Sequence, residues 1–247
     1  MECDREILEC AGISVAFGGF QALDNVELTC RRGEIAGLIG PNGAGKTTLI
    51  NVISGFQKSA AGSIRLSGRN ISRVPASKLS ALGLSRTFQG GRLFERMTVF
   101  ENVLAASLLT GVNRAEAAKR ANSLLDQFDL LHRSSTMASE LPYGEERLLS
   151  IARSLASQPT FLLLDEPAAG LNENETHRLK EKLGRIPGEF GCGMLIVEHD
   201  MDLIMGICEN VWVLANGKNL AHGLPEAVSS DKNVIREYLG EGLIDAA

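Results

Sequence analysis

The sequence lacks any apolar run near the roughly 20 residues that a membrane-spanning helix needs. Of its 247 residues 44% are hydrophobic, but the longest apolar runs, such as residues 161–164 and 194–197, have the length of buried strands. Residues 1–6 are mostly charged and contain no apolar signal-peptide core. We therefore expect a cytoplasmic protein with a substantial core, built as one large domain or as a domain with an insertion.

Paired cysteines and clustered basic residues are also missing. The five cysteines, Cys3, Cys10, Cys30, Cys192 and Cys208, show neither metal-ligand spacing nor a Cys-x-x-Cys pattern. Reduced and mostly packed thiols are therefore expected. A net charge of −5 without a basic run argues against nucleic acid as the main partner.

What the sequence does contain is a glycine-rich loop, residues 40–48, after the apolar run Ile35–Ile39. The pattern Gly-x-x-x-x-Gly-Lys-Thr between a strand and a helix is typical of phosphate binding, because glycines let backbone N–H groups wrap around phosphate oxygens. Lys46 is expected to reach the outer phosphates, and the Thr47 hydroxyl to ligate Mg²⁺. The loop predicts a nucleoside triphosphate site, whose other contacting residues are Asn42, Gly43, Gly45 and Thr48.

Local patterns around this loop predict a mixed α/β architecture. The expected strands are residues 6–17, 24–31, 62–68, 84–88, 161–164, 194–197, 211–215 and 218–222. The first two are expected to pair antiparallel, and the last two to form a hairpin around Asn216-Gly217. Residues 161–164 and 194–197 are apolar throughout, which favours buried parallel strands.

Helix starts are predicted from capping patterns in the sequence. The expected capping residues are Thr98, Asn113, Asn172 and Asp200, and Gly144 is expected to precede a further helix. Residues 98–158 have a helical pattern throughout. We therefore predict a nucleotide-binding core of residues 1–89 and 159–247, interrupted by an all-helical insertion at residues 90–158.

Two acids follow the predicted strand at residues 161–164. A carboxylate at the carboxyl end of a buried parallel strand lies near bound phosphates, so Asp165 is expected to hold the Mg²⁺ coordination sphere. Glu166 can then accept a proton from the attacking water, a contribution typically worth about 10²–10⁴-fold in rate. The pair predicts hydrolysis of the bound triphosphate.

The order of the motifs resembles that of the ATP-binding subunits of ABC transporters. Residues 141–145 fall on the family's signature motif and residues 169–172 on its dimer loop, while Gln89 matches the glutamine loop and His199 the switch histidine. The resemblance covers nearly the whole chain. It implies a single ABC ATPase domain over residues 1–247, with an α/β P-loop NTPase core, an antiparallel β subdomain and an all-helical insertion.

The resemblance also implies roles for individual residues. Phe17 is expected to stack on the adenine of ATP, where the family often has Tyr; the alternative is a core side chain in a strand. Gln89 is expected to bond Mg²⁺ or the attacking water, and His199 to donate a hydrogen bond to the γ-phosphate. Tyr143 and Gly144, at the start of a helix, are expected to contact the ATP of a second ATPase subunit.

The signature departs from the family pattern in three places. Pro142 stands where the family has Ser, Tyr143 where it has Gly, and Glu145 where it has Gln. A hydroxyl that would contact the γ-phosphate is therefore missing, so backbone N–H groups have to carry more of that contact. Tyr-Gly is familiar in one subgroup, the branched-chain (hydrophobic) amino-acid importers. The segments that resemble this subgroup include residues 17–23, 86–89, 92–94, 167–172 and 198–201.

The resemblance to this subgroup implies a set of partners. They are transmembrane permease subunits, a second ATPase subunit that is either a sister chain or a copy, and indirectly a solute-binding protein. The chain would then lie on the inner face of the cell membrane. Leu93, Phe94 and Met97 could line a groove for a permease helix, or could simply pack inside the chain. A competing class is a soluble ABC ATPase acting on nucleic acid or ribosomes, but the single cassette without sustained heptads disfavours it.

Overall fold

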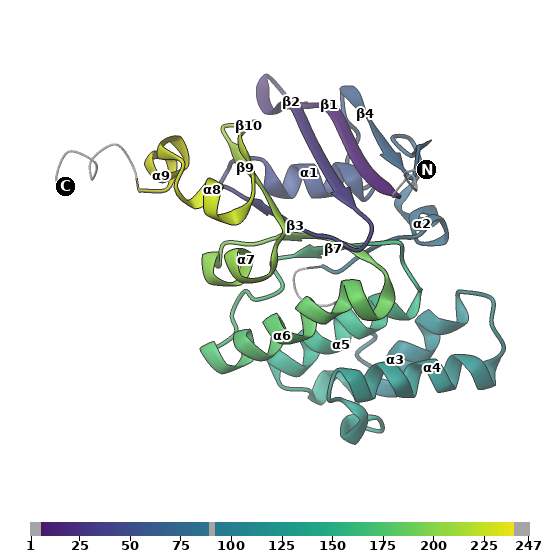
Figure 1. The fold of residues 1–247 in the computed structure, drawn as a ribbon. Coiled ribbons are helices and arrows are strands. Elements are labelled where there is room, and N and C mark those ends of the chain that lie inside the picture. The colour runs from purple at the N-terminus through teal and green to yellow at the C-terminus, as the bar shows by residue number, and fades with distance from the viewer. Residues whose placement is uncertain (1–5, 89–91, 240–247) are drawn as a thin grey trace, which may run out of the picture.

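Two β-sheets form the framework of the molecule (Figure 1). The computed structural model describes residues 6–88 and 92–239. The smaller sheet is antiparallel, with the strand order β2-β1-β4-β5. Its strands are β1 (Ile7–Phe17), β2 (Phe20–Arg31), β4 (Ala61–Leu66) and β5 (Arg69–Asn70).

The larger sheet has the strand order β10-β9-β3-β8-β7-β6. Its neighbouring strands are parallel except for β10, which runs antiparallel to β9. The strands are β3 (Ile35–Ile39), β6 (Leu84–Arg86), β7 (Phe161–Asp165), β8 (Gly193–Val197), β9 (Asn210–Ala215) and β10 (Lys218–Gly223). Because the carboxyl ends of parallel strands share one edge, the loops after β3, β7 and β8 meet there.

Helices connect the strands of both sheets. They are α1 (Lys46–Ile53), α2 (Ala76–Leu79), α3 (Val99–Leu108), α4 (Arg114–Gln127), α5 (Tyr143–Ala156), α6 (Glu173–Phe190), α7 (Met201–Ile207), α8 (Pro225–Ser229) and α9 (Lys232–Leu239). Side-chain caps are present at Thr98, Asn113, Asn172 and Asp200, as predicted. Within the described ranges, no helix combines the length and the apolarity that crossing a bilayer requires.

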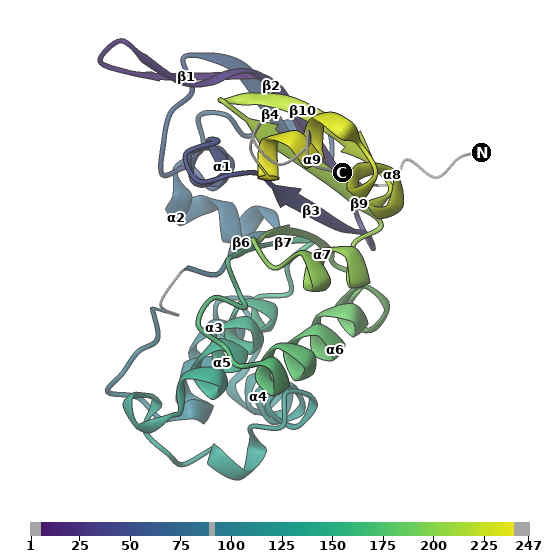
Figure 2. The ribbon, with the colours of Figure 1, turned by 90° about the vertical axis from the view of Figure 1, so that its left-hand side faces the viewer.

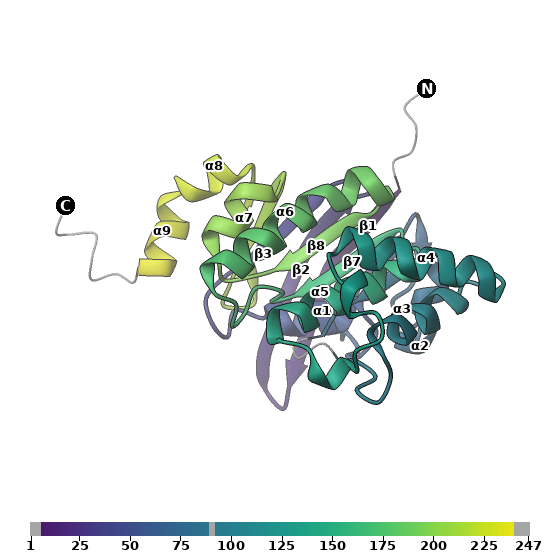
Figure 3. The same ribbon diagram turned by 90° about the horizontal axis from the view of Figure 1, so that it is seen from below.

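The larger sheet separates two hydrophobic cores. Helix α1 packs between the two sheets, while α3–α7 cover the opposite face of the larger sheet (Figure 2). Successive residues of a strand point to opposite faces of the sheet. In β7, Leu163 therefore belongs to the core between the two sheets, whereas Leu162 and Leu164 belong to the core under α3–α7. Viewed from below, α8 and α9 lie at the end of the molecule remote from α3 and α4 (Figure 3). The helices of the predicted insertion therefore share a core with the parallel sheet.

Several element boundaries differ from the sequence prediction. The strands predicted at residues 62–68 and 84–88 end earlier, at Leu66 and Arg86. Two other differences have a local cause. Strand β2 begins at Phe20 and not at residue 24, because Gly18 and Gly19, with φ of +58° and +139°, form a two-residue turn. Helix α5 begins at Tyr143, so Gly144 is its second residue and does not precede it. Pro142, whose ring holds φ at −57°, stands at the N-cap and directs the chain into that first turn.

The described cysteines are packed thiols, as expected. Cys10, Cys30, Cys192 and Cys208 are free and buried. Burial raises the pKa of the Cys10, Cys192 and Cys208 thiols to about 12, because a thiolate is poorly solvated in an apolar core. These thiols therefore remain protonated at neutral pH. Cys3 lies outside the described residues.

Two leucines with opposite exposure test this account of the core. Leu163 in β7 is fully buried, whereas Leu109 at the end of α3 is 81% exposed. Leu163→Ala is expected to lower the free energy of unfolding by about 2–5 kcal/mol, because it leaves a cavity between the sheets. Leu109→Ala, the same chemical change, should alter it by about 0.5 kcal/mol or less. Urea denaturation measures both, and equal losses would contradict the assignment of Leu163 to the core.

Candidate functional site

The loop between β3 and α1 lies at the shared edge of the parallel strands. Two positions of this loop require glycine, because the backbone of another segment comes too close to leave room for a side chain. A Cβ on Gly40 would lie 2.2 Å from the carbonyl oxygen of Leu214, and one on Gly45 would lie 2.8 Å from that of Ala22. Both glycines also have positive φ, +153° and +102°. The loop therefore holds a conformation that residues with a side chain cannot adopt without moving their neighbours.

The Lys46 ammonium folds back over this loop. Its Nζ donates to the carbonyl oxygens of Gly40, at 2.6 Å, and Pro41, at 3.0 Å. Burial lowers the pKa of Lys46, while the Glu166 carboxylate opposes that effect. Asn42, Gly43 and Thr47 are exposed along the crest of the loop, and Gly45 and Thr48 are half-buried. The loop thus combines a buried cation with an open crest.

Glu166 and His199 meet at this edge, although 33 positions separate them in the chain. The Glu166 Oε1 atom lies 3.3 Å from Nε2 of His199. Glu166 has a left-handed backbone with φ of +48°, a conformation that costs a residue with a side chain about 1–2 kcal/mol. Its N–H donates to the carbonyl oxygen of Val197, at 2.8 Å, which holds the turn against β8. The structure therefore brings together two of the predicted catalytic residues.

Asp165, the last residue of β7, is buried and ion-paired. Its Oδ2 accepts from Arg86, on the neighbouring strand β6, at 2.8 Å. Hard oxygen donors are what Mg²⁺ prefers, and the Asp165 carboxylate and the Thr47 hydroxyl are both of that kind. The donors at this edge thus fit the ion. The sequence prediction gave Arg86 no role in the site; it named this residue only within the segment 86–89, which resembles the amino-acid importers.

Glu198 is a second residue that the sequence prediction missed. It is 3% exposed, and its Oε1 accepts from the backbone N–H of Ala168 at 2.6 Å, while Oε2 accepts from that of His199 at 2.8 Å. The carboxylate therefore joins the segment after Glu166 to the segment that carries His199. The only indication of its role in the sequence is that Glu198 directly follows an apolar strand and precedes His199.

The start of α5 is bound to the loop before α6. The Tyr143 hydroxyl donates to the carbonyl oxygen of Ala169 at 2.9 Å. The Arg147 guanidinium lies 4.6 Å from the centre of the Tyr143 ring and donates to its hydroxyl. A Cβ on Gly170, which has φ of +81°, would come within 3.1 Å of the ring. Pro142 and Tyr143 are nevertheless exposed, and Gly144 is half-buried.

Phe17 lies at the tip of the β1–β2 hairpin. It is 49% exposed and pairs across the turn with Phe20, which is 68% exposed. This exposure excludes the interpretation of Phe17 as a core side chain and leaves its predicted contact with adenine as a proposal. Gln89, the remaining predicted site residue, lies outside the described residues.

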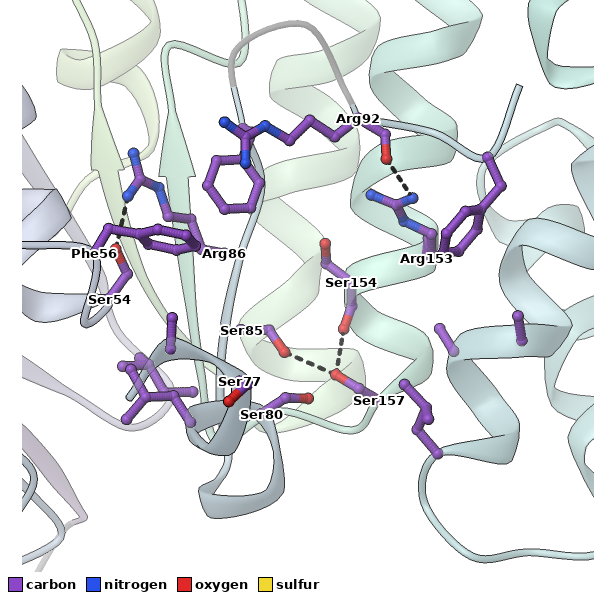
Figure 4. A pocket seen from close by; sticks show the side chains of 18 residues that line it. Ser54, Phe56, Ser77, Ser80, Ser85, Arg86, Arg92, Arg153, Ser154 and Ser157 are labelled. Carbon is purple, nitrogen blue, oxygen red and sulfur yellow. Dashed lines mark hydrogen bonds between the residues drawn. The ribbon is translucent and has the colours of Figure 1, made fainter. Parts of the chain in front are cut away.

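A groove of 790 Å³ opens between the larger sheet and the helices, lined by parts of α2, β6, α3 and α5 (Figure 4). We call it the α2–α5 groove. Its described lining contains no acidic residue but includes Arg86, Arg92 and Arg153. Phe94 lines this groove and is 53% exposed, whereas Leu93 and Met97 are half-buried. The groove is therefore apolar, and Arg92 and Arg153 give it a positive rim, because the charge of Arg86 is paired with Asp165.

Comparisons with known proteins assign this cassette to a family. The family model for ABC transporters matches residues 23–169. The high-affinity branched-chain amino acid transport ATP-binding protein LivG of Salmonella typhimurium is 42% identical over 96% of this chain and 99% of its own. BraF of Pseudomonas aeruginosa, also a high-affinity branched-chain amino acid transport ATP-binding protein, is 39% identical over 96% of this chain and 99% of its own. MJ1267, an ATP-binding cassette of an ABC transporter solved in its ADP conformation, is 32% identical with a TM-score of 0.85, over 96% of this chain and 99% of its own.

The chain thus belongs to the ABC transporter family. It is an ATP-binding subunit with ATPase activity, and it has the cassette fold that the sequence predicted. The family match also confirms the resemblance on which that prediction rested. The roles of the individual site residues remain proposals.

Glu198→Gln tests the link between the two segments of the site. The amide keeps one acceptor but turns an N–H₂ group toward a backbone N–H, so one buried donor loses its partner. We expect the free energy of unfolding to fall by about 1–3 kcal/mol. We also expect kcat to fall while ATP affinity stays within about twofold, because the glycine-rich loop at residues 40–48 is not part of this link. Glu181→Gln, at an exposed position of α6, is the control. Equal stability of the two variants would contradict the role of Glu198.

Proposed function

We propose that this chain powers an importer of branched-chain or other hydrophobic amino acids. The proposal is supported by its identity to LivG and BraF over nearly the full length of each protein. It is supported chemically by the contact between Glu166 and His199 at the edge that carries the phosphate loop. This contact is the observation on which the hydrolytic mechanism depends.

In the proposed site, ATP lies along the crest of the phosphate loop. Lys46 leaves the two carbonyl oxygens for the outer phosphates, because a hydrogen bond from its ammonium is stronger to a charged phosphate oxygen than to a neutral carbonyl oxygen. Thr47 and Asp165 hold Mg²⁺, with Gln89 as a further ligand; the ion neutralises phosphate charge when it is bound. Asn42, Gly43, Gly45 and Thr48 supply backbone and side-chain contacts, and the exposed Phe17 stacks on adenine.

Hydrolysis in this proposal is a matter of positioning and proton transfer. Glu166 accepts the proton of the attacking water. His199, within hydrogen-bond reach of that carboxylate, donates to the γ-phosphate. The buried carboxylate of Glu198 holds the two segments that carry these groups, so the base and the histidine keep their separation.

A second ATPase subunit completes each site. The exposure of Pro142 and Tyr143 at the start of α5 leaves this end of the helix open to a neighbouring chain. Backbone N–H groups there, at the positive end of the helix, favour the phosphates of ATP bound to that neighbour. Because the Tyr143 hydroxyl already donates to Ala169, its contribution to that contact comes from the ring and the backbone.

The α2–α5 groove is the proposed docking site for a permease helix. Phe94 projects from its wall, and the buried Asn102 holds the backbone of Phe94 through its N–H at 2.9 Å and its carbonyl oxygen at 3.1 Å. An apolar groove with a positive rim fits an amphipathic helix that carries an acid. The chain would then lie on the inner face of the membrane, with the solute-binding protein contacting only the permease. Nucleic acid has no part in this proposal.

Glu166→Gln tests the assignment of the base. The amide has nearly the same shape but cannot accept the proton, so turnover is expected to fall about 10²–10⁴-fold. Affinity for MgATP should stay within about twofold, and the closed dimer should accumulate because ATP persists between the subunits. Nucleotide binding, phosphate release and analytical gel filtration measure these three quantities. Unchanged phosphate release would remove Glu166 as the base.

Phe94→Ala tests the groove. Truncation of an exposed aromatic anchor is expected to cost about 1–2 kcal/mol of docking free energy, which is a factor of about 5–30 in affinity for the permease. Uptake of radiolabelled leucine should therefore fall more than basal ATP hydrolysis. Leu224→Ala, an exposed residue just before α8, is the matched control. If both activities of Phe94→Ala fell equally, the groove would have no docking role.

A further inference from the structure

The Arg86 side chain lies between the α2–α5 groove and the acid at the end of β7. Its guanidinium donates to Asp165 Oδ2 at 2.8 Å, to Asn51 Oδ1 at 2.8 Å and to Ser54 Oγ at 2.7 Å. The Arg86 and Asp165 side chains are only 7% and 10% exposed. A buried guanidinium with three directed hydrogen bonds has a fixed orientation, because its donors are arranged in a rigid plane.

These three contacts join two elements of the nucleotide site. Asn51 belongs to α1 and Ser54 caps its C-terminus, and the first turn of the same helix carries Lys46 and Thr47. Asp165 ends β7. One guanidinium therefore sets the distance between the helix that holds the phosphate-contacting residues and the strand that holds the carboxylate for Mg²⁺.

The other side of Arg86 forms part of the groove. Its Cζ lies 4.8 Å from the ring centre of Phe88 and 5.8 Å from that of Phe56. The two rings contact each other edge to face at 5.3 Å. Phe56, 54% exposed, lines the groove beside Arg86 (Figure 4). A helix that fills the groove must contact these rings, which contact Arg86 directly.

We propose that Arg86 is a positioning residue that orients Asp165 for Mg²⁺ and links that orientation to occupancy of the groove. When a group that donates a hydrogen bond to a metal-ligating carboxylate is replaced, metal affinity typically falls about 10–100-fold. Both halves rest on the proposed function: the first takes Asp165 as a ligand of Mg²⁺, and the second requires that a permease helix enters the α2–α5 groove. The first half concerns the isolated subunit.

The first test uses Arg86→Lys in the isolated subunit. Lysine keeps the positive charge beside Asp165 but cannot bond Asn51, Ser54 and Asp165 from one plane. ATP affinity in EDTA should stay within about twofold, whereas the affinity of the ATP-bound subunit for Mn²⁺, followed by electron paramagnetic resonance, should fall about 10–100-fold. Arg69→Lys, at an exposed position of β5, is the control. Unchanged Mn²⁺ affinity, or equal losses of Mn²⁺ and metal-free ATP affinity, would overturn the positioning role.

The second test compares the isolated subunit with the assembled transporter. Assembly is expected to change the Mn²⁺ affinity of the wild-type subunit, and the change should be lost in Arg86→Lys and reduced in Phe56→Leu, which alters the groove side alone. A wild-type affinity that assembly leaves unchanged would refute the link to the groove. If Phe94→Ala binds the permease normally while Arg86→Lys still weakens Mn²⁺ binding, the docking proposal fails and the positioning role stands.

Discussion

The parallel pairing of β3, β8 and β7 is the constraint on which the site depends. The register sets Leu38 of β3 beside Val197 of β8, and Val197 beside Asp165 of β7. Because the three strands point the same way, their carboxyl ends form one edge. Each of these ends is followed directly by one part of the site: the loop with Lys46, the acid Glu166, or the segment with His199. These parts therefore lie close together although they are far apart in the sequence.

The burial of charge at this edge follows from the same arrangement. Asp165 and Glu198 end or follow strands that are buried on both faces, and an isolated buried carboxylate is strongly disfavoured. Arg86 offsets the first charge and backbone N–H groups offset the second. These partners are directional, so the compensation of charge also fixes where each acid points. The same contacts therefore stabilise the fold and orient the acids of the site.

The departure of the signature from the family pattern has a structural explanation. The Tyr143 ring lies over Gly170, where a Cβ would approach it within 3.1 Å, and its hydroxyl is bound to Ala169. The tyrosine therefore fills space between α5 and the loop before α6 in its own chain. The Arg147 guanidinium also packs against the ring, 4.6 Å from its centre. The start of α5 and this loop are consequently held together as one surface, the surface that we propose faces a second subunit.

Local features of the structure could be predicted from the sequence because they depend on neighbours in the chain. The phosphate loop, the side-chain caps such as those at Thr98 and Asn172, and the hairpin at Asn216 are all of this kind. Glu166 was expected in the site because it follows a buried strand, and His199 through resemblance to a family, but their direct contact was not predicted. Exposure was not predictable: Leu93, Phe94 and Met97 are all apolar, and only the packing leaves Phe94 exposed while the other two are half-buried.

A phosphate loop, a parallel sheet and a helical region could be predicted from local patterns, because periodicity and capping act over a few residues. The partners of Asp165, Glu198 and Tyr143 are visible only in the folded chain. Arg86 and Asp165 are separated by 79 positions, and Glu198 and Ala168 by 30. Such pairs form because strand order and register place them together, and no pattern within a local window contains that information.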